Sequence, residues 1–311
     1  MARKLVNELT WSVSRDKLFR TCERAYYYNY YGSWGGWDRN ADPHTRKLYI
    51  LKQIKSMPMW AGQIVHEVIA EALRGYSMKK SPITTGELQA RARQKLRNGW
   101  VDAVDRAWLQ KPKKNNLHEL YYGNGKTLPP EQTERIKKRV YQCLQAFAGS
   151  TVLKEMLAAS YMSWRPVDTL DSFMLDDQLK VWCALDFAFV TPAGSLRVID
   201  WKTGKERAND LRLQLACYAQ YAQLEWMTPI EQQQLQAVFL PENARVSEYK
   251  ISAEDLVSAK DTILNSAAEM RRKLVKPEAN EAREEDFTCC NDAATCRQCK
   301  FREVCQPENT F

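Results

Sequence analysis

The stretch Val198-Ile199-Asp200-Trp201-Lys202-Thr203-Gly204 (VIDWKTG) ends a predicted β-strand in this chain of 311 residues. Its branched and aromatic side chains favour a strand, and the Thr-Gly pair breaks it. Because side chains alternate between the two faces of a strand, Asp200 and Lys202 point to the same side. The strand therefore places a carboxylate beside an ammonium group.

A second predicted strand, residues 178–190 (QLKVWCALDFAFV), precedes this one across a Thr-Pro-Ala-Gly turn. With residues 195–201 it forms a predicted hairpin, in which Asp186 lies close to Asp200. Neighbouring strands are about 4.8 Å apart, so the two carboxylates can share a divalent cation such as Mg²⁺. An ammonium group at Lys202 then suits metal-assisted hydrolysis of a phosphodiester. A salt bridge on a solvated strand face is the simpler explanation of Asp200 and Lys202 considered alone.

The order of predicted elements indicates an α/β protein with a mixed β-sheet flanked by helices. We expect a single domain over residues 1–311, with a charged, mostly helical insertion at residues 76–165. The other expected elements are helices at 14–31, 62–74, 209–226 and 253–274 and strands at 235–241 and 245–251.

The composition is typical of a soluble globular protein, with 44% hydrophobic and 27% charged residues. No apolar run is long enough to cross a membrane and no signal-peptide core is present, so we expect a cytoplasmic protein with no membrane partner. The formal net charge of +8 weakly favours nucleic acid as a partner. Lys111, Lys113 and Lys114 are candidates for contacts with a DNA backbone, although a solvated loop also explains them.

Five segments in order resemble the PD-(D/E)XK nuclease superfamily, in its RecB-like branch. The resemblance is nearest to the C-terminal nuclease domain of AddB and to the CRISPR-associated spacer-acquisition exonucleases. It implies a restriction-endonuclease-like core and a metal-dependent DNA nuclease, most simply an exonuclease that acts on single-stranded ends. The segments are SVSRDKLFRTCERAYYYNYYG (12–32), GQIVHEVIAEAL (62–73), LDFAF (185–189), VIDWKTG (198–204) and LQLACYAQYA (213–222).

The resemblance also implies a set of metal ligands. In this branch a histidine in a Gly-x-x-x-His-Glu motif and two acids bind Mg²⁺ or Mn²⁺, which here are His66, Asp186 and Asp200. The carbonyl oxygen of Trp201 is a further implied ligand, and Glu67 is a weaker candidate. Considered alone, a histidine at the edge of an apolar helical stripe is more often a structural group.

Three more residues receive catalytic roles from the resemblance. Lys202 would orient or activate the attacking water and stabilise charge on the phosphate. Gln214 and Tyr218, one helical turn apart and therefore on one face, would position the DNA strand. Such a pair is also common on helix surfaces.

The resemblance leaves the process open among DNA repair, recombination, phage replication and CRISPR-type DNA processing. No Walker A motif occurs in the chain, so we expect that any unwinding requires a helicase or a recombination or CRISPR partner. One alternative function is a DNA-end-binding or assembly subunit that has this fold and needs a partner to cleave. The other is a cysteine-based redox or zinc protein that regulates transcription.

Three of the nine cysteines lie in CRQCKFREVC, as Cys296, Cys299 and Cys305. Three thiolates within ten residues suit a metal or cluster, which then requires a fourth ligand. In the iron–sulfur members of the resembled branch this ligand comes from the N-terminal helix, here Cys22. The resemblance thus implies a [4Fe–4S] cluster in the segment 285–306, packed against that helix.

Two other readings of the cysteines stay open. A Cys₄ zinc site uses similar spacing, and Cys289 or Cys290 can supply a local fourth ligand in place of Cys22. The scattered cysteines Cys143, Cys183 and Cys217 are explained as small buried apolar residues.

Overall fold

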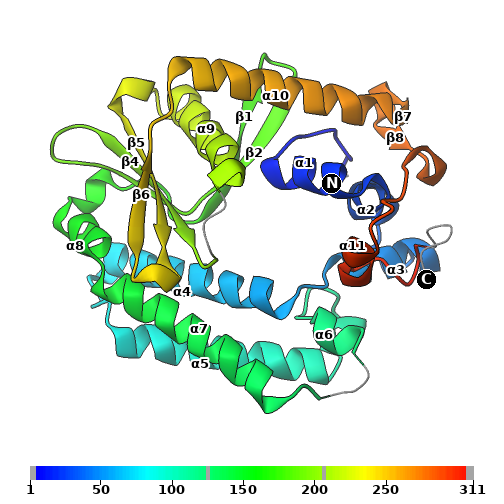
Figure 1. Cartoon of the computed structure of the whole chain (residues 1–311), viewed down its shortest axis with the longest axis horizontal. Coiled ribbons are helices and arrows are strands. Elements are labelled where there is room, and N and C mark those ends of the chain that lie inside the picture. Colours follow the sequence, from blue (N-terminus) through cyan, green and yellow to red (C-terminus); the bar gives the residue numbers. More distant parts are fainter. Residues whose placement is uncertain (1–4, 124–126, 205–207, 306–311) are drawn as a thin grey trace.

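A mixed four-stranded β-sheet forms the centre of the computed structural model, which describes residues 5–123, 127–204 and 208–305. The strand order is β3-β4-β5-β6, with β4 and β5 parallel and the two outer pairs antiparallel. Helices lie on both sides of the sheet, so the predicted α/β class is confirmed (Figure 1). The strands are β3 (Phe187–Val190), β4 (Leu196–Lys202), β5 (Gln233–Phe239) and β6 (Arg245–Tyr249).

The predicted strand 178–190 is divided at Asp186. Its first part, β2, pairs with a strand that the sequence analysis did not predict, and its second part is β3, which pairs with β4. Phe187 lies opposite Ile199, so Asp186 sits next to Asp200 as the hairpin required. The separate two-stranded sheet consists of β1 (Thr169–Leu175) and β2 (Leu179–Leu185).

Alternate side chains of β4 fill two different hydrophobic cores. Ile199 and Trp201 pack with the helices of residues 57–158, whereas Leu196 and Val198 pack with the helices on the other face. Asp200 has the same orientation as Leu196 and Val198 and is only 3% exposed. The helices on that face are α9 (Ala208–Glu225) and α10 (Ala253–Arg272), and Ser252 caps α10 in a capping box.

The predicted helix 14–31 is interrupted at Cys22, whose backbone is extended (φ −164°, ψ 112°). Ser12 caps the first helix, which therefore begins at Val13, because its hydroxyl accepts a hydrogen bond from the backbone N–H of Arg15 at 3.2 Å. The break presents the Cys22 thiol between two helices. These are α1 (Val13–Thr21) and α2 (Glu23–Tyr27), followed by a π-helical turn at Tyr28–Gly32.

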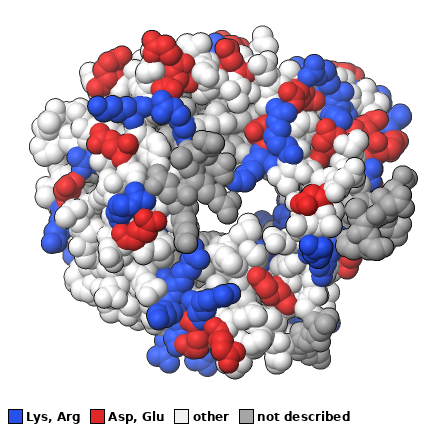
Figure 2. Space-filling view, viewed as in Figure 1, with Lys and Arg blue, Asp and Glu red and all other residues white. Residues whose placement is uncertain are grey.

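The whole chain has a ring-like outline (Figure 1). In this ring, α1 and α2 lie between α10 and the C-terminal segment. Figure 2 shows the opening in the space-filling view, with Lys and Arg side chains at its rim. None of the described helices has the length and apolarity needed to cross a membrane. The other α-helices are α3 (Pro43–Lys52), α4 (Met57–Lys79), α5 (Thr85–Val104), α6 (His118–Tyr121), α7 (Pro130–Gly149), α8 (Thr151–Ala158) and α11 (Ala293–Gln298).

Short elements complete the described chain. A small antiparallel pair, β7 (Leu274–Lys276) and β8 (Glu281–Ala282), follows α10. The 3₁₀ turns lie at Ala107–Leu109, Tyr161–Ser163, Ile230–Gln232, Leu240–Glu242, Pro277–Ala279 and Glu284–Asp286.

Candidate active site

Asp186 links helix α4 to strand β4 at the break between β2 and β3. Its Oδ1 lies 2.8 Å from Nδ1 of His66, and its Oδ2 accepts a hydrogen bond from the backbone N–H of Trp201 at 2.7 Å. Burial lowers the pKa of His66, but the charge and hydrogen bond of Asp186 outweigh it and raise that pKa to about 9. Without a metal, His66 is therefore an imidazolium paired with Asp186 at neutral pH.

Asp200 lies beside this pair, on the face of β4 that is covered by α9. One of its oxygens, Oδ2, is 2.6 Å from Nζ of Lys202 but accepts no well-directed hydrogen bond from the described residues. Burial raises the pKa of Asp200, and the negative charge of Asp186 raises it further. Because burial and the Asp186 charge disfavour the ionised form of Asp200, a cation bound next to it would stabilise that form.

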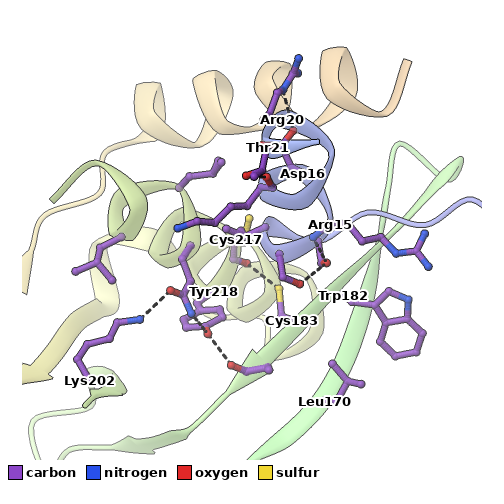
Figure 3. Close-up of a pocket in the computed structure, with 18 of the residues that line it drawn as sticks. Arg15, Asp16, Arg20, Thr21, Leu170, Trp182, Cys183, Lys202, Cys217 and Tyr218 are labelled. Atoms are coloured by element: carbon purple, nitrogen blue, oxygen red, sulfur yellow. Dashed lines mark hydrogen bonds and ion pairs between the residues drawn. The ribbon is translucent and has the colours of Figure 1, made fainter. Parts of the chain in front are cut away.

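Helix α9 contributes Gln214 and Tyr218 to the same group of residues. Gln214 accepts a hydrogen bond from Lys202 Nζ at 2.9 Å and donates to Asp200 Oδ1 at 3.1 Å and to the Tyr218 hydroxyl at 2.5 Å. Tyr218 in turn donates to the carbonyl oxygen of Ala184 at 2.6 Å. Figure 3 shows how this chain of contacts runs from Lys202 through α9 to strand β2. The predicted spacing of one helical turn thus places both side chains against Asp200.

The chemistry of these donors fits a hard divalent cation, which prefers carboxylate oxygens and accepts imidazole less readily. As they stand, no three His, Cys, Asp or Glu side chains of the described residues have the geometry to hold a metal ion. In the described structure both Asp186 oxygens are engaged, one with His66 and one with the backbone N–H of Trp201, and Asp200 is paired with Lys202. The under-bonded Asp200 Oδ2 is the atom best suited to a cation.

Two residues beside the site were not predicted. The backbone N–H of Asp168 donates to the carbonyl of Asp186 at 2.9 Å, and the charge of Asp168 contributes to the raised pKa of His66. Arg139 of α7 contacts the carbonyl oxygen of Thr203, directly after Lys202. Neither residue belongs to a local pattern, since Asp168 precedes an unpredicted strand and Arg139 is one of many charges on an amphipathic helix.

Two weaker candidates have ordinary structural partners. Glu67 accepts a hydrogen bond from Gln63 at 2.7 Å and forms an ion pair with Lys95 at 2.9 Å. Lys114 forms an ion pair with Asp102 at 3.1 Å. These contacts favour the structural explanation for both residues.

Six cysteines from opposite ends of the described chain line one cavity of about 510 Å³. Cys22 accepts a hydrogen bond from the backbone N–H of Cys290 at 3.4 Å. The sulfur atoms of Cys289 and Cys305 lie 3.5 Å apart, and those of Cys290 and Cys296 lie 3.7 Å apart. The sixth, Cys299, also lines the cavity.

This cavity contains more thiols than the four that a four-thiolate centre requires, although in the described structure no three of them are arranged to hold a metal ion. Burial raises the pKa of the Cys22, Cys290 and Cys299 thiols, so each is neutral in the absence of a cation. A bound metal reverses this preference, because it stabilises the thiolate. By contrast, the three scattered cysteines, Cys143, Cys183 and Cys217, are buried among apolar side chains.

Comparison with known proteins agrees with this geometry. A search of curated proteins finds no match. The sequence profile of the PD-(D/E)XK nuclease superfamily matches residues 10–306, which include all of the residues described above. The mixed sheet with flanking helices is consistent with the restriction-endonuclease-like fold of that superfamily. This chain therefore belongs to the PD-(D/E)XK nuclease superfamily.

Proposed function

We propose that this nuclease is an exonuclease of the RecB-like branch that shortens single-stranded DNA ends in the cytoplasm. Membership of the superfamily implies phosphodiester hydrolysis with Mg²⁺ or Mn²⁺ and DNA as the substrate. The observation that carries the proposal is the connected group formed by His66, Asp186, Asp200 and Lys202, which come from three separate segments.

In this proposal His66, Asp186 and Asp200, with the carbonyl oxygen of Trp201, hold the metal ion. When bound there, a divalent cation would lower the pKa of a water molecule and polarise the phosphate. Asp186 is well placed for this role, because one oxygen is fixed by the Trp201 N–H and the other faces His66. Binding requires the His66 proton to leave, since only a neutral imidazole is a ligand.

Lys202 has a separate task. Its ammonium group lies between Asp200 and Gln214, from where it orients the attacking water and stabilises the negative charge that develops on the phosphate. Gln214 and Tyr218 hold Lys202 and Asp200 in register and position the strand. A partly buried ammonium group is effective because water screens its charge less than at the surface.

Two observations support action on a free single-stranded end. The opening in the ring-like outline, which has Lys and Arg among the side chains at its edge, gives a strand end a place to enter (Figure 2). The cavity next to Lys202 is lined by aromatic and aliphatic as well as cationic side chains, as expected for unpaired bases. A helicase or a recombination or CRISPR partner would deliver such ends.

A cleavage assay on end-labelled single-stranded and duplex DNA tests this function. We expect shortening with Mg²⁺ or Mn²⁺, none with EDTA, and a loss of about 100-fold or more in the Lys202→Ala variant. Lys260→Ala, which removes a surface ammonium paired with Asp176, is the matched control and should cleave normally. If the folded wild-type protein binds ends but does not cut them under any of these conditions, a DNA-end-binding subunit that needs a partner explains it better.

We further propose that Cys22, Cys296, Cys299 and Cys305 hold a [4Fe–4S] cluster. The six-cysteine cavity supports this proposal, since it brings Cys22 to the C-terminal segment. Such a centre would join two chain segments that are distant in sequence, as a long-loop disulfide does. Zinc, or a ligand set that includes Cys289 or Cys290, is the competing arrangement.

The cluster can be tested without any activity assay, by visible absorbance and by iron and sulfide content after anaerobic purification. We expect Cys22→Ser to lose iron and visible colour, and Cys143→Ser, a buried cysteine outside the cavity, to keep both. Full iron in Cys22→Ser together with its loss in Cys290→Ser would assign the fourth ligand to Cys290. A colourless protein that contains zinc would replace the cluster with a zinc site.

A further inference from the structure

We propose that the cavity between α1 and the β1–β2 hairpin binds the DNA strand next to the scissile phosphate, with Trp182 as a stacking platform for a base. The proposal rests on the nuclease function proposed above. It names a positioning residue and a path for the strand, neither of which follows from the metal site alone.

The cavity is continuous with the active site. It has a volume of about 950 Å³, and Lys202, Gln214 and Tyr218 line one part of it. Trp182 and Leu170 lie at the opposite end in Figure 3, on strands of the hairpin, while α1 forms another wall. A strand whose phosphate reaches Lys202 therefore has its neighbouring nucleotides in this cavity.

One face of the hairpin is not covered by the protein and carries apolar side chains beside Ser172 and Lys180, whose ammonium group lies 6.0 Å from the centre of the Trp182 ring. Leu170 is 66% exposed, and Ala184 opposite it is also exposed, whereas Phe173 and Val181 on the other face are buried. Trp182 stands on the uncovered face and is partly exposed. Contact between these apolar side chains and water is unfavourable. A nucleobase that packs on them would remove this contact and bind favourably.

The platform is held rigidly. The backbone N–H of Trp182 donates to the carbonyl oxygen of Trp11 at 2.8 Å, in addition to the pairing of β2 with β1. Trp11 is fully buried, and its indole N–H donates to Ser266 of α10 at 3.0 Å. Because the strand that carries Trp182 is anchored on both sides, a base can stack on its indole without first ordering the protein.

The charges of the cavity suit a phosphate backbone. Among the described residues, its wall carries four cationic side chains, Arg15, Lys17, Arg20 and Lys202, and one acidic one, Asp16. Arg20 pairs with that acid at 3.3 Å and also with Glu269 of α10, and the Arg15 guanidinium stacks on the Tyr30 ring at 4.0 Å from its centre. These contacts hold both guanidinium groups at the α1 wall, and the Lys17 and Lys202 side chains add to the positive charge of the cavity.

This combination favours an unpaired strand over a duplex. In a duplex the bases stack on one another and present only their edges, so an indole face has nothing to pack against. In a single strand each base offers its own face to an aromatic side chain while cations follow the backbone. The cavity has both features on facing walls.

The experiment compares kcat/KM for oligothymidylate with kcat/KM for the p-nitrophenyl ester of thymidine 5′-phosphate. The ester is too short to extend from the metal site to Trp182, so the ratio of the two values reports the rest of the cavity. We expect Trp182→Ala to lower this ratio about tenfold, through KM for the oligonucleotide, and Trp182→Phe to restore most of it. Trp37→Ala is the matched control, since Trp37 is 41% exposed and lies outside the cavity.

Leu170→Glu is a second variant at a position too exposed to disturb folding, and its added charge should repel phosphate and also lower the ratio. If neither substitution changes the ratio while wild-type protein hydrolyses both substrates, the strand does not use this cavity and the proposal fails. If the wild-type protein hydrolyses neither substrate with Mg²⁺ or Mn²⁺, the proposed nuclease function itself fails. The two failures are therefore distinguishable.

Discussion

Arg139 holds the carbonyl oxygen of Thr203 with both Nε, at 3.1 Å, and Nη2. The arginine comes from the middle of α7, and the threonine directly follows Lys202 at the end of β4. A guanidinium group that grips a backbone oxygen from two nitrogens fixes both its distance and its direction. The end of β4, the strand that carries Asp200 and Lys202, is thus bound to α7, a helix that packs on the other face of the sheet from Asp200.

Replacing Arg139 by Gln should lower kcat by about ten- to 100-fold, because Lys202 loses its fixed position relative to the metal ligands. The measurement is the cleavage rate at saturating DNA, with circular dichroism as a check on folding. Arg135→Gln, on an exposed turn of the same helix, is the control. Unchanged cleavage in the Arg139 variant would show that the Thr203 contact does not position Lys202.

Gly62 of α4 lies directly against Thr203, and a Cβ atom at position 62 would be 2.9 Å from its Oγ1. We expect Gly62→Ala to lower cleavage, because Thr203 must move, and Thr203→Ala to restore it in the double variant. Gly75→Ala in the same helix meets nothing within 4 Å. This control should raise the free energy of unfolding by up to about 1 kcal/mol without affecting cleavage. If Gly62→Ala and Gly75→Ala cleave DNA at the same rate, the expected clash between residue 62 and Thr203 does not occur.

Tyr218→Phe should lower both stability and cleavage. The variant removes the hydrogen bond from the buried Tyr218 hydroxyl to the carbonyl oxygen of Ala184, at a cost of about 1 kcal/mol in the free energy of unfolding, and releases Gln214 from one partner. Urea unfolding and the cleavage rate measure the two effects. Tyr221→Phe removes a hydroxyl that donates to Asp171 at 2.7 Å, elsewhere on α9. It should destabilise without slowing cleavage, and a similar activity loss in both variants would make the effect of Tyr218 purely structural.

Glu23 makes stability depend on pH at the join between α2 and the C-terminal segment. Burial by itself would raise its pKa, but Lys273 at 2.7 Å and the N–H and hydroxyl of Thr288 outweigh burial and lower it. A carboxylate with a lowered pKa in the folded state stabilises fully above its unfolded pKa, and this contribution is lost as the pH falls through the folded value.

Urea unfolding of the metal-free protein should therefore show stability falling below about pH 4.5, with a shallower fall in Glu23→Gln. Glu231→Gln, a surface substitution in a 3₁₀ turn, serves as the control and should follow the wild-type curve. Parallel curves for wild-type protein and Glu23→Gln would mean that these bonds exist equally in the unfolded chain or do not form.

Much of the site could be predicted from local patterns. The alternation of VIDWKTG fixes the side to which Asp200 and Lys202 point, and the short turn after Val190 fixes the register that brings Asp186 opposite. Helical periodicity similarly places Gln214 and Tyr218 on one face. Each of these inferences uses residues that are close in sequence or joined by one hairpin.

The features that were missed depend on tertiary contacts. Apolar residues on both sides of Asp186 give no sign that the strand breaks there, because the break accompanies the pairing of β2 with β1 and the hydrogen bond from the Asp168 N–H. The same holds for the helix break at Cys22, where the backbone turns extended to meet the segment near Cys290. The periodicity of apolar residues predicts where a helix or strand forms. It does not predict a break that depends on contacts with residues elsewhere in the chain.

The contact between the N-terminal helices and the C-terminal segment has a consequence for biosynthesis. The Tyr28 hydroxyl donates to Glu284 at 2.6 Å, 256 positions later, and its ring packs on Phe301 with centroids 5.4 Å apart. On the ribosome Glu284 emerges 256 residues after Tyr28, so the Tyr28 ring stays without these partners while that length of chain is synthesised. We expect nascent chains to need chaperones until this segment has emerged, and chains truncated before Glu284 to aggregate.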